Sequence, residues 1–174
     1  MVDEGWGRPD IDWLKINKPG VLANARKRGK EVHAAIDRYV AEDAGYVDEL
    51  SDISFPLFES FLAVADDLPL TPAGISETPT GGWCGYGTTP DRVEPRALIE
   101  WKGTHAIHPN IWIQLAGQEY ALSGGQVNRP RIIVHLQKSG KRAKVLTDEQ
   151  PERTTQMWKA TLEKREWKKE VNWK

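Results

Sequence analysis

The stretch Gly85-Tyr-Gly-Thr-Thr-Pro-Asp-Arg-Val-Glu-Pro-Arg-Ala-Leu-Ile-Glu-Trp-Lys-Gly103 decides how this chain folds. Two runs suited to extended strands flank the short segment 94–97, which contains Pro95. Proline fixes its own φ and has no N–H to donate, so it favours a turn over the middle of a strand. We therefore predict a β-hairpin. With the turn centred just after Pro95, Asp91 lies opposite Glu100.

The second strand of this hairpin carries charged and apolar side chains in alternation. Because side chains alternate across a strand, Glu100 and Lys102 share one face, while Ile99 and Trp101 point to the other. Asp91 then joins Glu100 and Lys102 in one patch, backed by apolar residues. Two carboxylates and an amine could hold a hard divalent cation and assist hydrolysis of a phosphodiester. The same residues could also form an ordinary solvated face, because short motifs have a high false-positive rate.

The residue order around this patch matches a known family signature. Pro90-Asp91, followed by Glu100-Trp101-Lys102, has the order and spacing of the PD-(D/E)XK nuclease signature. More narrowly, the chain resembles the RecB-like and phage recombination exonuclease branch over residues 26–146. The resemblance implies an α/β, restriction-endonuclease-like core, in which a small mixed β-sheet is flanked by helices. It also implies catalytic roles for Asp91, Glu100 and Lys102, and a Mg²⁺ or Mn²⁺ cofactor held by Asp91, Glu100 and the carbonyl of Trp101.

A helix is predicted over residues 21–44 from its apolar periodicity. Within it, Arg28-Gly-Lys-Glu-Val-His33 resembles the helix of this branch that carries a glycine and a histidine, which implies that His33 is a metal ligand. Taken alone, a histidine at a helix edge is more often packed or solvated. Arg28 and Lys30 belong to a basic cluster beside it, which either contacts substrate phosphate or forms a solvated face.

Supporting roles follow from two further motifs of the branch. Glu77 is the candidate for an acidic residue on the strand before the Asp, and could instead be an exposed strand residue. Gln114 matches a glutamine motif on the helix after the Glu-x-Lys strand. The branch usually has a tyrosine four residues later, where this chain has Gln118 and places Tyr120 two residues further on. These side chains could bind substrate phosphate or orient a carboxylate, or could form a plain helix surface.

The other elements are predicted from local patterns. Further helices are expected at 55–67, 111–122 and 148–173, a strand around 75–78, and a hairpin of strands at 131–137 and 141–146. Lys18-Pro19-Gly20 is interpreted as a break, and Asn110 as a helix N-cap. Met157, Trp158 and Leu162 are expected to dock the last helix on the sheet.

Bulk properties bound the class of protein. With 174 residues and no linker or repeat, the chain is expected to form one domain, 1–174. Its single cysteine, Cys84, allows no internal disulfide, which fits a reducing cytoplasm, either bacterial or that of a host if the protein is phage-encoded. The net charge of −1 means that any electropositive surface must be local. No apolar run approaches the roughly 20 residues that span a bilayer, so no membrane partner is expected.

The resemblance favours a metal-dependent DNA exonuclease of the recombination or repair type, acting on single- or double-stranded DNA ends. An endonuclease or junction-resolving enzyme on the same fold is the first alternative, and a non-catalytic nucleic-acid-binding module is the second. The resemblance leaves open a homo-oligomer and a partner protein that binds or anneals single strands. Because Mg²⁺ prefers oxygen ligands, an imidazole ligand predicts at least equal activity with Mn²⁺.

Overall fold

A five-stranded mixed sheet in the order β1-β4-β5-β6-β7 forms the centre of the molecule. The computed structural model describes residues 19–43, 45–48, 50–76, 80–81, 84–125 and 129–170. The sheet strands are β1 (Ile75–Ser76), β4 (Arg92–Glu94), β5 (Ala97–Lys102), β6 (Arg131–His135) and β7 (Lys144–Thr147). Strands β5 and β6 are parallel, and the other neighbours are antiparallel. The expected α/β class with a small mixed sheet is confirmed.

The hairpin of β4 and β5 has the predicted register. Arg92 pairs with Ile99 and Glu94 pairs with Ala97, so the turn falls at residues 95–96. Continued by one residue, this register places Asp91 opposite Glu100. The proline therefore lies at the turn, where its missing N–H costs no ladder bond.

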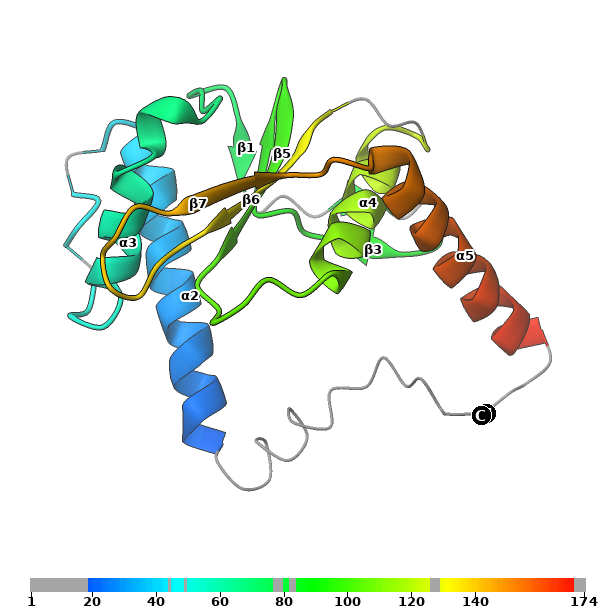
Figure 1. Cartoon of the computed structure of the whole chain (residues 1–174), viewed down its shortest axis with the longest axis horizontal. Helices are drawn as coiled ribbons and strands as arrows, with labels where there is room; N and C mark the ends of the chain where they lie inside the picture. Colours follow the sequence, from blue (N-terminus) through cyan, green and yellow to red (C-terminus); the bar gives the residue numbers. More distant parts are fainter. Residues whose placement is uncertain are drawn as a thin grey trace.

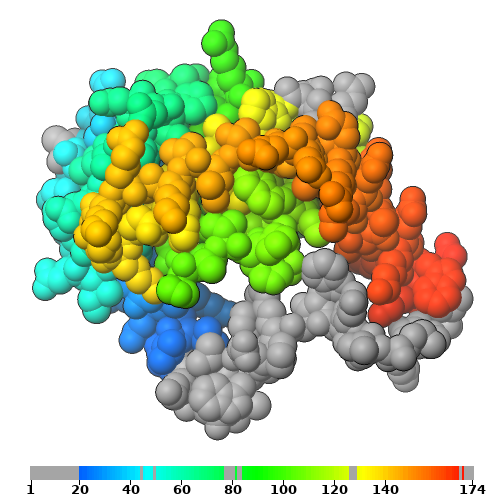
Figure 2. All heavy atoms as spheres, viewed as in Figure 1, coloured from blue at the N-terminus to red at the C-terminus, as the bar shows by residue number. Residues whose placement is uncertain are grey.

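Helices cover both faces of the sheet, as predicted. Helices α2 (Pro19–Val40) and α3 (Phe55–Leu62) lie side by side on one face, and α4 (Asn110–Leu122) lies on the other, next to α5 (Pro151–Glu170) (Figure 1). A short 3₁₀ turn, η1 (Ala65–Asp67), follows α3. A separate ribbon of β2 (Thr80–Gly81) and β3 (Gly87–Thr88) contacts α4. On the face shown in Figure 2, the loop before β7 lies at the left side, and β7 runs from there toward the centre.

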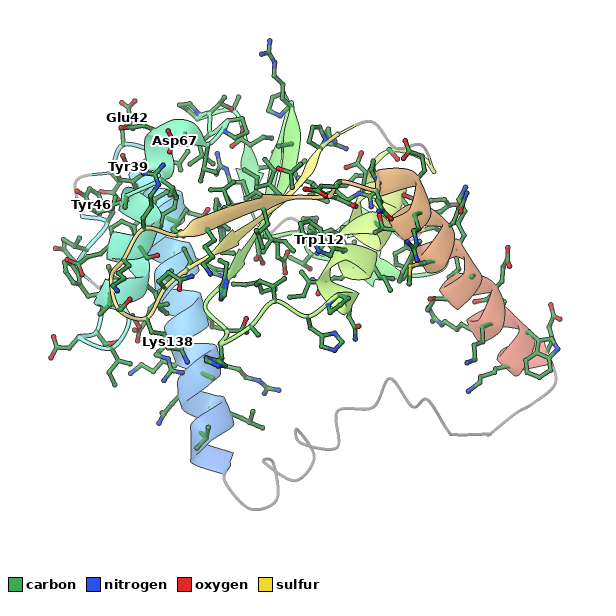
Figure 3. All side chains as sticks on the ribbon, in the orientation of Figure 1. Tyr39, Glu42, Tyr46, Asp67, Trp112 and Lys138 are labelled. Carbon is green, nitrogen blue, oxygen red and sulfur yellow. The ribbon has the colours of Figure 1, made fainter. Side chains whose placement is uncertain are left out.

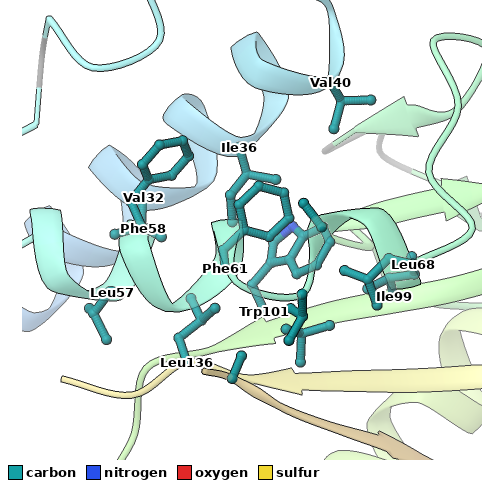
Figure 4. Close-up of a cluster of buried hydrophobic side chains, with 14 of the residues drawn as sticks. Val32, Ile36, Val40, Leu57, Phe58, Phe61, Leu68, Ile99, Trp101 and Leu136 are labelled. Carbon is teal, nitrogen blue, oxygen red and sulfur yellow. The ribbon is translucent and has the colours of Figure 1, made fainter. Parts of the chain in front are cut away.

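Alternation along β5 divides the core into two clusters. Ile99 and Trp101 join the larger cluster under α2 and α3, where the buried indole of Trp101 meets the ring of Phe61 edge-on at 5.7 Å (Figure 4). Leu98 faces the other way and packs with Leu115 of α4 and with Ile133. Glu100 lies on the same side of the strand as Leu98 and therefore faces α4. This confirms the predicted split of β5 between a charged face and an apolar one.

Two helix boundaries differ from the sequence expectation. The segment read as a break, Pro19-Gly20, is the first turn of α2, because proline is tolerated where the helix N–H groups have no intrahelical partner. This helix ends at Val40, before Glu42 with its φ of 59°. Asn110 is not the N-cap. Pro109 holds that position, no side chain caps the helix, and Asn110 is the first helical residue.

The last helix docks on α4 rather than on the sheet. Trp158 lies against Gly117, where the absence of a side chain lets the indole approach the backbone. Met157 is 41% exposed and makes no such anchor. Buried Arg131 of β6 ties the start of α5 to the sheet by donating to Asp148 Oδ2 at 2.8 Å and to Thr155 Oγ1 at 2.6 Å. Within the described residues no helix is both long enough and apolar enough to cross a membrane.

Candidate functional site

The β4–β5 hairpin brings Asp91 to the main chain of β5. The backbone N–H of Trp101 donates to Asp91 Oδ2 at 2.9 Å. The Trp101 side chain is 2% exposed and belongs to the hydrophobic core, so only its main chain faces the carboxylate. A core residue thus fixes the strand against which Asp91 is held. The proposed ligand role of the Trp101 carbonyl stays a prediction.

Glu100 is a buried carboxylate whose two oxygens differ. Its Oε1 accepts from Lys102 Nζ, in a short ion pair, and from Gln114 Nε2 at 3.0 Å. Its Oε2 is buried and has no hydrogen-bond partner among the described residues. Burial raises the pKa of Glu100 above its ordinary value and the charge of Asp91 raises it further, whereas Lys102 and then His33 act in the opposite direction. The two carboxylates therefore repel each other in a poorly solvated place.

His33 reaches the same place from α2. Its Nδ1 lies 3.7 Å from Asp91 Oδ1, which is within ion-pair range but long for a hydrogen bond. A sequence-distant helix thus supplies an imidazole beside the first carboxylate. The structure brings together His33, Asp91, Glu100, Lys102 and Gln114.

The other two residues of the glutamine motif separate. Gln118, one turn after Gln114, is 2% exposed and lines a cavity together with it. Tyr120 lies elsewhere on α4, with Lys159 Nζ 5.6 Å from its ring centre and Gly125 against its ring. A residue six positions after Gln114 projects from a different side of a helix with 3.6 residues per turn. The departure from the family motif therefore displaces the tyrosine from the cluster.

The basic residues before His33 divide between two sides of α2. Lys30 is exposed and precedes His33 by three positions, which places the two side chains next to each other on the helix. Arg28 is half-buried and precedes His33 by five positions, on a different side. Of this pair, Lys30 has the better position for a phosphate that approaches the cluster. Glu77, the remaining supporting candidate, lies outside the described residues.

Sequence reasoning missed the residue that fixes α2 relative to the hairpin. Arg92 of β4 is buried, donates to Glu94 Oε1 at 2.7 Å and to Ser76 Oγ at 2.8 Å, and lies 3.8 Å from Asp37. Asp37 follows His33 by one turn of α2 and also accepts from Ser76 at 2.5 Å. Arg92 is thus a positioning residue for His33. The alternation of Arg92 and Glu94 gave a signal that both share one face, but on an exposed strand such a pair is ordinary.

The donor atoms suit a hard divalent cation, although they are not gathered into a complete coordination group. Within the described ranges no set of three or more His, Cys, Asp or Glu side chains is arranged to hold a metal ion. Even so, Glu100 Oε2 is a buried carboxylate oxygen without a partner among the described residues, close to the charge of Asp91. Such an oxygen is costly unless something satisfies it. A cation between the two carboxylates, with His33 as a further donor, would do so.

No protein-family model matches this chain, and no curated protein sequence matches it. The comparison with the nuclease signature therefore depends on the residues themselves and on their placement. What the structure adds is the convergence of two carboxylates, a lysine and a histidine from four separate positions in the chain. Chemically, such a group can bind a cation and a phosphate, orient a water molecule, and transfer a proton.

Proposed function

We propose that this protein is a divalent-metal-dependent nuclease that hydrolyses DNA phosphodiester bonds, and that its sheet and helices form a restriction-endonuclease-like core. The single observation that carries this proposal is the meeting of Asp91, Glu100 and Lys102 at one place. Their order in the chain is that of the PD-(D/E)XK signature. A solvated charged face, the main alternative, is disfavoured because Glu100 is 1% exposed.

Each side chain has a role that its position supports. Asp91 and Glu100 would hold Mg²⁺ or Mn²⁺, and His33 would add an imidazole donor beside Asp91. When bound, the cation would neutralise charge on the phosphate and acidify water. Lys102, held against Glu100, would orient the attacking water or stabilise the charge that grows on the phosphate. Gln114 fixes the Glu100 carboxylate by donating to its Oε1.

The preference for an exonuclease of the recombination or repair type rests on the resemblance to that branch. An exonuclease requires a DNA end, whereas an endonuclease or junction-resolving enzyme does not. A covalently closed circle therefore separates the two. Lys30, exposed on α2, would contact the backbone of the bound strand, and Arg28 would do so only from another side of the helix.

The test is digestion of end-labelled linear duplex, single-stranded DNA and closed circular DNA with Mg²⁺, Mn²⁺ or EDTA. The proposal expects cleavage of linear DNA with either metal and none in EDTA. Glu100→Gln and Lys102→Ala should each slow cleavage by about 100-fold or more. Matched controls are Glu149→Gln and Lys138→Ala, both exposed; Lys138 lies on the loop between β6 and β7 (Figure 3).

Three results decide the proposal. Cleavage that persists at the normal rate in both Glu100→Gln and Lys102→Ala would place the chemistry elsewhere and refute the assignment. Cleavage of the closed circle as fast as the linear form would keep the site but replace the exonuclease with an endonuclease. If no DNA is cleaved but DNA still binds, the protein is the non-catalytic nucleic-acid-binding module.

A further inference from the structure

A neutral cavity adjoins the candidate site. It has a volume of about 360 Å³, and the residues that line it come mainly from β3, α4 and α5. Gln114 belongs to both places, because its side chain lines the cavity and donates to Glu100. No acidic or basic side chain is among the described residues that line it. Its size is that of an ordinary small-molecule site.

The side-chain oxygens of two amides in the wall of the cavity lack hydrogen-bond partners among the described residues. Gln118 is 2% exposed, and its Oε1 has none. Asn110, on the same wall of α4, has a buried Oδ1 that also has none. A buried polar atom without a partner costs free energy, so both are expected to meet a ligand that supplies hydrogen bonds. Rotation of an amide by half a turn exchanges its donor and acceptor, which suits a ligand that carries both.

Aromatic rings form another part of the wall. The rings of Tyr86 and Trp158 meet at a centroid distance of 5.0 Å and an angle of 65°. The Tyr86 hydroxyl donates to the Gly117 carbonyl at 2.7 Å, which fixes the ring against α4. Thr88 and Thr161 add hydroxyl groups at the margin. A wall of aromatic rings, amides and hydroxyl groups carries no charge. It suits a flat, uncharged heterocycle with hydrogen-bonding edges, and a nucleobase has these properties.

We propose that this cavity binds one unstacked nucleobase of the strand whose phosphodiester lies at Asp91 and Glu100. The inference rests on the proposed nuclease function and extends it, because it assigns a base-binding subsite next to the phosphate site. Gln118 and Asn110 would bond the edge of the base, and Tyr86 or Trp158 would contact its face. Because Gln114 joins the two places, the bound base would also place its own phosphate near Glu100.

The test measures binding rather than cleavage. Fluorescently labelled single-stranded oligonucleotides, one intact and a series with a single abasic position each, are titrated with the full chain in EDTA. The wild-type protein should lose about tenfold in affinity when the abasic position occupies the cavity, as expected for one lost stacked base. Gln118→Met, nearly the same shape, should bind the intact strand and every abasic strand equally.

Companion variants separate this role from a structural one. Gln118→Met should unfold at the same temperature as the wild type or higher, because the Gln118 Oε1 that it removes has no partner among the described residues. Thr161→Phe, which narrows the cavity from an exposed position, should also abolish the abasic effect. Gln156→Met, an exposed amide on α5, should preserve it.

The outcomes distinguish this inference from the nuclease proposal. A flat abasic profile in the wild type, or no binding of any strand, overturns the base subsite even if DNA is cleaved with metal. A position-specific abasic effect that Gln118→Met removes supports the subsite even if no cleavage is seen, and the nuclease proposal then fails alone. If free nucleosides remove the abasic effect at concentrations far below that of the strand, the cavity is assigned to free nucleosides instead.

Discussion

Glu100 should destabilise the metal-free protein, and its neutral analogue should relieve the cost. In Glu100→Gln the shape and the acceptor for Lys102 and Gln114 remain, while the buried charge disappears. The unsatisfied oxygen and the neighbouring Asp91 charge both act against the wild-type carboxylate. An unsatisfied buried group costs about 1–3 kcal/mol. For a chain of this size each kcal/mol shifts the unfolding temperature by about 2–4 °C, so a relief of about 2 kcal/mol raises it by about 4–8 °C.

Glu94→Gln is the matched control, because Glu94 is equally buried but fully engaged. Its carboxylate accepts from Arg92 and from the N–H and hydroxyl of Thr71. The same substitution there removes the buried carboxylate charge that pairs with Arg92 at 2.7 Å, and should cost about 3 kcal/mol. Thermal and urea unfolding in EDTA at neutral pH measure both variants. If the Glu100→Gln variant is no more stable than the wild type, the unsatisfied Glu100 carboxylate does not carry the expected cost.

The difference in stability between the wild type and Glu100→Gln should change with pH in one direction. The folded-state pKa of Glu100 is raised above its ordinary value of 4.5, so burial disfavours the charged form. The wild type therefore loses stability relative to Glu100→Gln as the pH rises through that raised value. Below pH 4.5 Glu100 is protonated in both the folded and the unfolded wild type, so the stabilities of the wild type and of Glu100→Gln should converge. Mn²⁺ at 100 times its wild-type Kd should stabilise the wild type by about 2.7 kcal/mol, and Glu100→Gln by about 1.4 kcal/mol or less if its binding is at least tenfold weaker.

Three further predictions concern α2, β6 and α4. His33→Ala should lose the Mn²⁺ response while Mg²⁺-dependent activity persists, and an unchanged Mn²⁺ affinity in calorimetry would remove His33 from the site. Arg131→Met should lower the unfolding free energy by about 3–5 kcal/mol in urea, because the Asp148 side chain then stays buried without its opposite charge; a loss below 1 kcal/mol would contradict this. Gly117→Ala should destabilise by about 1–2 kcal/mol, because the new methyl would lie 2.8 Å from the Trp158 ring. Gly29→Ala, which meets nothing within 4 Å, should instead stabilise, and equal effects at both glycines would show that the contact with Trp158 does not matter.

The hairpin was predictable because local rules determine it. Proline limits the turn to one place, and strand alternation then decides which side chains share a face. These two rules place Asp91 opposite Glu100 and send Trp101 into the core, as the structure shows. The proximity of His33 to Asp91 needed the family resemblance, because no local rule relates a helix to a distant strand.

Long-range packing set the features that the sequence did not reveal. Helical spacing predicts Gln118 beside Gln114 but does not predict its burial. Gln118 lines one cavity with Trp158 and Thr161 of α5, a helix that docks on α4 and not on the sheet as the sequence predicts. Trp158 packs against Gly117 because the missing side chain leaves room for an indole. A glycine in a helix has several possible reasons, so its presence alone does not predict this contact. The burial of Arg92 follows from no local rule, because Thr71 and Asp37 contact it only once three segments have come together.

Whether Asp91 and Glu100 hold one divalent cation can be measured by Mn²⁺ titration followed by electron paramagnetic resonance. The wild type should bind Mn²⁺, while Asp91→Asn and Glu100→Gln should each weaken binding by about tenfold or more, and the exposed control Asp66→Asn should bind normally. Equal Mn²⁺ affinity in the wild type and both site variants would show that Asp91 and Glu100 do not hold the cation.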